Sequence, residues 1–206
     1  MAIIDFPAGI PLRAVNWRQS GGVVRNRSEF TGKTRELRIG PSARWTCDLE
    51  FVPTNSVTAL NLLRQFLADM AQPGDGFRLQ AVEAAQAVAP VPVTCLVNGA
   101  NQLGQTLNLD GLQASVTNLP AGAMISVPIT TDDRQLIVLR SALIANGSGQ
   151  AAATLATPLR GPPADNAVVQ IHFPVAAMRL SDSAINWAVS PGGVYDFQRL
   201  TAEEFF

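Results

Sequence analysis

Short apolar segments separated by glycine and proline turns run through most of this chain, and only one stretch has helical periodicity. The clearest strand pattern is 44–52, where apolar and polar side chains alternate: Trp45, Cys47, Leu49 and Phe51 against Thr46, Asp48 and Glu50. Alternation of this kind predicts a half-buried strand with a polar outer face. An earlier strand begins near Leu12, and we expect Gly21-Gly22 to form the turn that ends it.

One apolar stripe has the spacing of a helix. Leu60, Leu63, Leu67 and Met70 recur at intervals of three and four residues, which places them on one face of a helix. We predict this helix over about 55–71, with Thr54 or Asn55 as its N-cap and the turn at 72–76 as its end.

A soft Ala/Pro-rich stretch at 84–92 divides the chain, and more short strands follow it. The predicted fold class is mainly β: a discontinuous outer β-sandwich or barrel with one α-helix, plus an inserted small all-β domain. The outer domain would comprise 1–90 and 175–206, and the insert 91–174.

Charge is scarce and unevenly distributed. Charged residues make up 15% of the chain, which favours an assembly subunit, although a β domain rich in polar uncharged residues could also remain soluble. The segment from Arg13 to Arg44 holds eight basic and two acidic residues and so has a net charge of +6. The rest of the chain has a net charge of −7, which gives −1 for the whole chain. A net charge of −1 argues against a dedicated nucleic-acid binder.

Two interpretations of the basic segment remain open. It is either a solvated basic hairpin or a surface that meets acidic groups on a neighbouring subunit. In the second case Arg25, Arg27, Arg35 and Arg38 are the candidate subunit-interface residues, because arginine forms planar bidentate contacts.

The sequence predicts no catalytic residues, no metal ligands and no cofactor. His172 is the only histidine, and Cys47 and Cys95 match no metal or redox spacing, so we expect buried free thiols. The carboxylate pairs Asp132-Asp133 and Glu203-Glu204 are adjacent and would point to opposite faces of a strand. Carboxylates brought together from distant positions remain an alternative.

The most apolar run, 81–97, contains Glu83, Gln86, Pro90 and Pro92, and we expect no membrane insertion. The N-terminus lacks a basic segment typical of a signal peptide, so we expect synthesis in the cytoplasm.

Four places in the chain resemble the distal-tail and tail-tip (baseplate) structural proteins of long-tailed, siphophage-like bacteriophages and prophages. They are the Arg-Trp strand at 43–51, the helix and glycine turn at 59–77, the β insert at 97–160, and the C-terminal segment at 195–205. The succession of strand, single helix, glycine turn and strand is similar to the tube-forming fold of tail-tube and distal-tail proteins.

This resemblance implies a virion subunit of the tail tip, made in the host cytoplasm, that assembles with itself into a ring. The ring is commonly six-fold, joins the tail tube to the hub and tip proteins, and passes DNA only as cargo through its lumen. The resemblance carries over no catalytic residue. Two alternatives are a carbohydrate-binding module at 91–174, where Phe173 is the only aromatic residue, and a carboxylate-dependent hydrolase.

Overall fold

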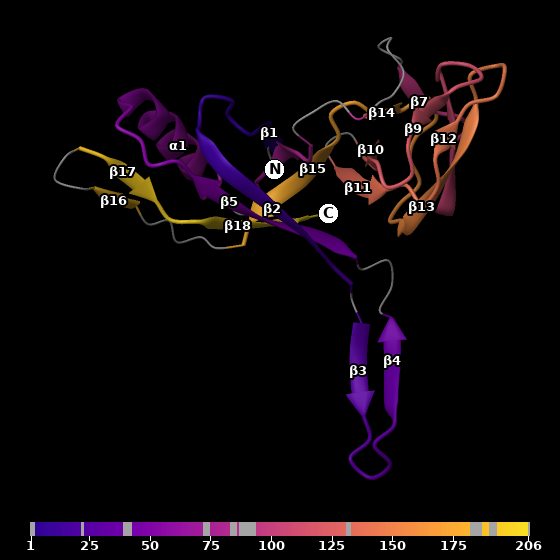
Figure 1. The fold of residues 1–206 in the computed structure, drawn as a ribbon, viewed down its shortest axis with the longest axis horizontal. Helices are drawn as coiled ribbons and strands as arrows, with labels where there is room; N and C mark the ends of the chain where they lie inside the picture. The colour runs from indigo at the N-terminus through magenta and orange to yellow at the C-terminus, as the bar shows by residue number, and fades with distance from the viewer. Residues whose placement is uncertain are drawn as a thin grey trace.

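A six-stranded sheet forms the centre of the protein. The computed structural model describes residues 3–21, 23–38, 43–71, 75–82, 86, 94–130, 133–181, 187–189 and 193–205. The strand order in the sheet is β1 (Ile3–Asp5), β6 (Gly76–Gln80), β15 (Val175–Leu180), β18 (Leu200–Glu204), β5 (Arg44–Phe51) and β2 (Leu12–Ser20). β1 pairs in parallel with β6, and the other neighbours are antiparallel. The sheet therefore joins the beginning of the chain to its end (Figure 1).

Helix α1 (Val57–Asp69) packs on one face of this sheet. Its apolar stripe contributes Leu60, Leu63 and Phe66, which are almost fully buried in the same cluster as Cys47 and Leu49 of β5. The alternation in β5 therefore places Trp45, Cys47, Leu49 and Phe51 against the helix side, as predicted. The predicted mainly β fold with one helix in the described part of the chain is confirmed.

The helix begins at Val57, two residues after the predicted start at about 55. Ser56 is the N-cap, and its side chain accepts a hydrogen bond from the backbone N–H of Ala59 at 3.3 Å. The predicted cap at Thr54 or Asn55 is wrong. The hydroxyl of Thr54 accepts instead from the N–H of Ser56 at 3.1 Å, and the backbone of Thr54 bridges to Tyr195.

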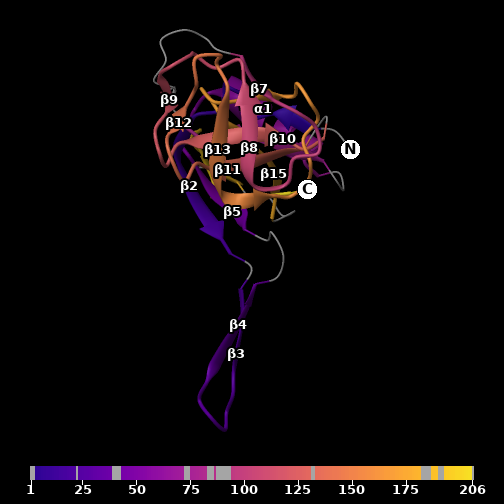
Figure 2. The same cartoon turned by 90° about the vertical axis from the view of Figure 1, so that its right-hand side faces the viewer.

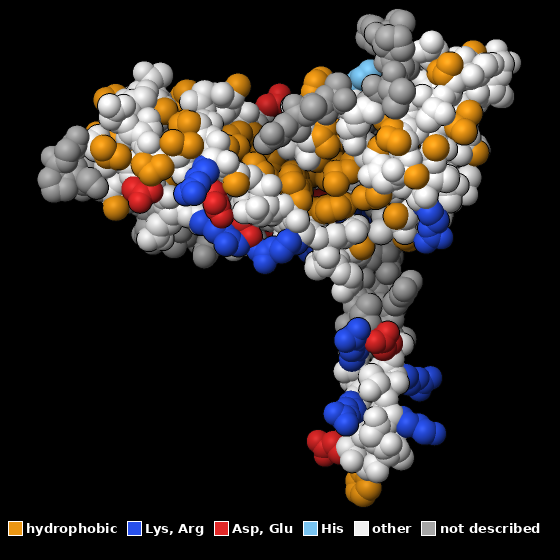
Figure 3. All heavy atoms as spheres, in the orientation of Figure 1, with side chains coloured by type: hydrophobic (Ala, Val, Ile, Leu, Met, Phe, Trp, Pro, Cys, Tyr) orange, Lys and Arg blue, Asp and Glu red, His pale blue; other side chains and the backbone are white. Residues whose placement is uncertain are grey.

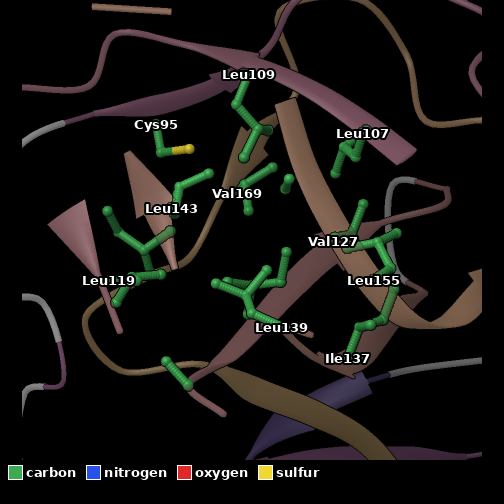
Figure 4. Packing of buried hydrophobic residues seen from close by; sticks show 14 of the residues in the cluster. Cys95, Leu107, Leu109, Leu119, Val127, Ile137, Leu139, Leu143, Leu155 and Val169 are labelled. Carbon is green, nitrogen blue, oxygen red and sulfur yellow. The ribbon is translucent and has the colours of Figure 1, made fainter. Parts of the chain in front are cut away.

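Several smaller sheets surround a second core. Four strands have the order β13 (Ala151–Leu159), β8 (Gly104–Asp110), β7 (Cys95–Val97) and β14 (Val168–Val169). The pair β10 (Met124–Pro128) and β11 (Arg134–Val138) and the pair β9 (Thr117–Leu119) and β12 (Leu143–Ile144) complete it. Their apolar side chains point toward one another from all of these strands (Figure 4). This second cluster is wholly aliphatic apart from Cys95.

The β10–β11 hairpin belongs to both cores. Ile125, Val127 and Ile137 lie in the second cluster, whereas Leu136 lies in the cluster of the six-stranded sheet. The indole N–H of Trp45 donates to the carbonyl of Leu136 at 2.8 Å, which ties the hairpin to β5. The two cores are therefore joined through one shared element. The predicted domain boundaries near 90 and 175 remain a prediction.

Two further hairpins extend from the molecule. β3 (Val23–Arg27) pairs with β4 (Thr34–Arg38), and β16 (Trp187–Val189) pairs with β17 (Tyr195–Phe197). The predicted turn at Gly21-Gly22 includes Gly22, which lies outside the described residues; β2 ends at Ser20, and β3 pairs with β4 across a reversal at 28–33. Figures 1 and 2 show that the β3–β4 hairpin projects away from the rest of the molecule. Residues 23–38 are called the arm below.

Candidate functional site

The arm is the most exposed element of the protein. Its two strands pair only with each other, in a register that places Arg25 opposite Glu36 and Arg27 opposite Thr34. Every side chain described from Arg25 to Glu36 is exposed. A two-stranded hairpin alone in water is marginally stable at best. An arm of this kind is typical of an element that gains its buried surface from a partner.

A closed turn forms the tip of the arm. The backbone N–H of Ser28 donates to the carbonyl of Lys33 at 2.9 Å, and the N–H of Gly32 donates to the carbonyl of Ser28 at 2.9 Å. Gly32 has a φ of 64°, in the left-handed region that glycine adopts without steric cost. The turn displays Phe30, whose side chain is fully exposed.

Three of the four predicted interface arginines have described side chains. Arg25 and Arg27 lie on one face of the arm, and Arg35 lies on the other face opposite Asn26. Arg25 Nε is 2.8 Å from Glu36 Oε1, while Arg27 and Arg35 have no ion-pair partner among the described residues. Arg38 ends β4, and its side chain lies outside the described residues. Both faces of the arm are therefore basic.

The arm concentrates the charge surplus of the chain. Residues 23–38 hold five basic and two acidic residues, which is a net charge of +3. The rest of the chain has a net charge of −4, and the whole chain has −1. Basic side chains lie along the arm in Figure 3, with one hydrophobic side chain at its tip. A surface of this charge is suited to an acidic partner.

The outer face of the six-stranded sheet, opposite α1, differs from the arm because its charges pair with each other. Arg179 donates to Glu203 at 2.6 Å, and the side-chain amide of Asn16 donates to Glu50 at 3.2 Å. Arg18 and Arg199 both donate to the carboxylate of Asp48. These pairs leave little surplus charge for a partner.

Asp48 is buried, although the alternation in β5 predicted a polar outer position for it. Its exposed fraction is 1%, because Arg18 and Arg199 cover it and the hydroxyl of Thr201 donates to Oδ1 at 2.9 Å. Burial raises the pKa of Asp48, but the hydrogen bonds from Thr201 and Arg199 and the charge of Arg18 outweigh it and hold this pKa below its usual value. The carboxylate is a structural anion that joins β2, β5 and β18.

A second buried carboxylate joins the two cores. Glu204 is fully buried, and its oxygens accept hydrogen bonds from the backbone N–H groups of Trp45 and Leu136, both at 3.1 Å. Its Oε2 also lies 2.6 Å from the guanidinium of Arg160, which is itself buried. Each element at this junction, β5, β11, β18 and the end of β13, therefore contributes to one hydrogen-bonded network.

The carboxylates considered for hydrolysis do not form an open site. Glu203 pairs with Arg179 on the outer face, and Glu204 points into the junction. Asp132 lies outside the described residues. Burial raises the pKa of Asp133, with the charge of Glu204 adding to it and that of Arg160 opposing it. Asp133 and Glu204 line neither of the two pockets described below.

The two thiols and the one histidine of the sequence lie in buried or partly buried positions. Cys47 and Cys95 are buried free thiols, as predicted, and burial raises the pKa of each to about 12. A thiol with such a pKa is inert near neutral pH. His172 is partly buried, and in the part of the chain that the structure describes no group of histidine, cysteine and carboxylate side chains could hold a metal ion.

Among the pockets formed by the described residues, two differ clearly in chemistry. The larger, of about 570 Å³, lies between the two edge strands of the six-stranded sheet and is lined by residues of β1, β2 and β6. The smaller, of about 390 Å³, is lined by amide and aliphatic side chains of the second core, with Asn98, Asn108 and Gln150 among them. The first combines apolar walls with charged groups, and the second has no charged group.

Comparison with known proteins does not assign the chain to a family. No protein-family model matches the sequence, and a search of curated proteins found no matching relative. Among the described residues, no helix combines the length and the apolar character needed to cross a membrane.

Sequence patterns located the basic segment but did not indicate that it forms a hairpin projecting from the rest of the molecule. The Ser28 to Lys33 turn contains Gly32, which could have indicated the reversal, and Phe30 is an aromatic residue among polar neighbours. Nothing in the local pattern indicated that Asp48 and Glu204 are buried, since their partners come from distant strands.

Proposed function

We propose that this chain is a structural subunit of a phage tail tip, which assembles with copies of itself into a ring that joins the tail tube to the hub. The resemblance of the strand, helix and glycine turn at 43–77 to distal-tail proteins motivates the proposal. The observation that carries it is the arm: an exposed hairpin of net charge +3 on a chain whose remainder carries −4. Opposite charges of this size favour contact between the arm of one copy and the remainder of another.

The geometry of the arm is compatible with a closed assembly. An arm that docks on a different surface of the next copy makes a heterologous contact, and repeated heterologous contacts give a ring when the rotation closes. The ring expected from the resemblance is a hexamer, with DNA passing through its lumen as cargo. The buried carboxylates and inert thiols fit a subunit without catalytic residues.

The test is the oligomeric state of a variant in which Arg25, Arg27, Arg35 and Arg38 are all replaced by Gln. We expect rings of the unchanged chain at high concentration in negative-stain images, and a shift of the variant toward monomer in light scattering. The matched control replaces the same four residues by Lys, which keeps the charge and should retain most of the association. A strict monomer of the unchanged chain at every concentration and low salt would rule out the proposal.

A second candidate function is carbohydrate binding by the insert. The observation that favours it is the smaller pocket, where Asn98, Asn108 and Gln150 present amide groups and no charged side chain lines the walls. Amide groups can donate to and accept from sugar hydroxyls. A glycan array probed with the full chain should give a signal that Asn108→Ala removes, and no signal for the unchanged chain would eliminate this candidate.

A further inference from the structure

The larger pocket opens between the two edges of an incomplete sheet. β1 and β2 are the edge strands of the six-stranded sheet, and each pairs with a neighbour on one side only. Asp5 of β1 and Leu12, Ala14 and Val15 of β2 nevertheless line the same cavity of about 570 Å³. The sheet therefore curls so that its two edges face a common opening.

The pocket has the chemistry to hold an aromatic side chain with charged neighbours. Phe6, Val15 and Phe173 provide apolar walls, and Phe173 is 46% exposed. The charged residues of the lining are the exposed Asp5 and Arg13 and also Arg78, whose guanidinium lies 3.5 Å from the carboxylate of Asp5. Within the part of the chain that the structure describes, Oε1 of Gln170 is a buried acceptor in this lining that has no hydrogen-bond partner. Buried acceptors without a hydrogen-bond partner are rare in native proteins, so a donor from a bound partner would suit this position.

The tip of the arm has the complementary chemistry. Phe30 has an exposed fraction of 101%, whereas Leu103, the next most exposed large hydrophobic residue described, has 61%. The turn that holds Phe30 also presents Glu29 and Lys33, both exposed. Glu29 is complementary to Arg13, whereas Asp5 of the pocket is already paired with Arg78. An aromatic side chain buries on the order of 150–250 Å² when it enters such a pocket.

The tip cannot reach the pocket of its own chain. β2 runs from Leu12, at the pocket, to Ser20, at the base of the arm, and β3 continues away from the sheet. These two strands separate the tip from the pocket by roughly 40 Å, at about 3.3 Å per strand residue. Figures 1 and 2 show the arm extending away from the sheet in both views.

We infer that the arm tip of one copy docks in the pocket between β1 and β2 of a second copy, with Phe30 as its anchor. This contact is heterologous, because the tip and the pocket are different surfaces of the chain, so it can repeat from copy to copy and gives a ring when the rotation closes. The inference rests on the proposed function, since it requires copies of the chain to associate. It identifies the partner of the arm as the sheet edge of another copy, and not nucleic acid or a different protein.

The experiment places the photoreactive residue p-benzoylphenylalanine at position 30 of the full chain. After irradiation, mass spectrometry should find a product of twice the chain mass, with the cross-link in the segments 5–15, 78–82 or 170–175. Phe30→Ser should raise the apparent dissociation constant for self-association about thirtyfold, which is the effect of a typical interface anchor. Leu103→Ser is the matched control and should leave that constant within about twofold.

The outcomes separate this inference from the proposed function. If the unchanged chain forms oligomers but the cross-links map elsewhere, or Phe30→Ser associates as well as Leu103→Ser, the docking of the tip is wrong and the ring proposal stands. If light scattering finds only monomer for the unchanged chain, both are wrong. A cross-link within a single chain would also overturn the inference, because it would place the tip in its own pocket.

Discussion

At the scale of single residues, two buried carboxylates hold distant strands together in different ways. Asp48 lies between arginines that are themselves half exposed, whereas Glu204 pairs with an Arg160 that is 7% exposed. Removing one partner of a buried ion pair leaves an uncompensated charge, which costs far more than loss of an exposed pair.

The adjacent residues Glu203 and Glu204 provide a direct test of this difference. Glu204→Gln should lower the free energy of unfolding by about 3 kcal/mol, because the charge of Arg160 stays buried without its partner. Glu203→Gln, whose partner Arg179 is 51% exposed, should cost less than about 1 kcal/mol. Urea denaturation of both variants checks the prediction, and equal losses would contradict it.

Asp48 makes stability depend on acidity. Its pKa in the folded chain is lowered, so its contribution to the free energy of unfolding is present above the unfolded pKa of about 3.9 and is lost as the pH falls through the folded pKa. Asp48→Asn should cost about 2 kcal/mol at pH 7, and the gap to the unchanged chain should narrow below about pH 4. Denaturation measured from pH 7 to pH 2.5 tests this, and parallel curves for the two proteins would disprove it.

At the scale of elements, the strands and the helix follow local patterns, but their ends do not. The stripe of Leu60, Leu63 and Leu67 predicted α1, because burial of one face determines where apolar residues must lie. The cap was misplaced because Thr54, Asn55 and Ser56 can all act as N-caps, and the pairing of Thr54 with Tyr195 decides among them.

The position of the cap can be tested with two neighbouring substitutions. Ser56→Ala should lower the free energy of unfolding by about 1 kcal/mol, because the N–H of Ala59 loses its acceptor. Asn55→Ala should change it by less than about 0.5 kcal/mol, since the exposed Asn55 caps nothing. Thermal unfolding followed by circular dichroism distinguishes them, and a larger loss for Asn55→Ala would mean that the helix begins earlier.

The reversal of the arm shows a second limit of local patterns. The sequence did not indicate which glycine turn would join two paired strands, and the strands of the arm, β3 and β4, meet at the turn that contains Gly32. The choice depends on which strands find cross-strand partners, and β2 pairs with β5 instead of β3.

At the scale of the whole molecule, the two cores are coupled through the β10–β11 hairpin. Leu136 packs in one cluster while its neighbour Ile137 packs in the other, and Glu204 accepts a hydrogen bond from the backbone of Leu136. If the hairpin separates from either core, its side chains leave both clusters, and apolar surface of both cores is exposed to water. The molecule should therefore unfold as one cooperative unit.

The two cysteines report on the two cores separately, since Cys47 lies in the cluster of the six-stranded sheet and Cys95 in the other. Both thiols should be unreactive toward a thiol reagent in the folded protein and become reactive at the same urea concentration. Mass spectrometry of the labelled peptides measures each one, with the fully unfolded chain as the control for complete labelling. Separate midpoints would show that the cores unfold independently.

The sequence by itself determined the mainly β character, the single amphipathic helix, the buried face of β5 and the charge of the arm, because each depends on residues that are close along the chain. Only the tertiary structure decided that Asp48 and Glu204 are buried, that β10–β11 joins two cores, and that a pocket lies between β1 and β2. These features bring together residues from segments that are far apart in the sequence, and the periodicity of one segment carries no information about its partners in another. The pocket between β1 and β2 and the exposed tip of the arm can be described only once both are placed in space.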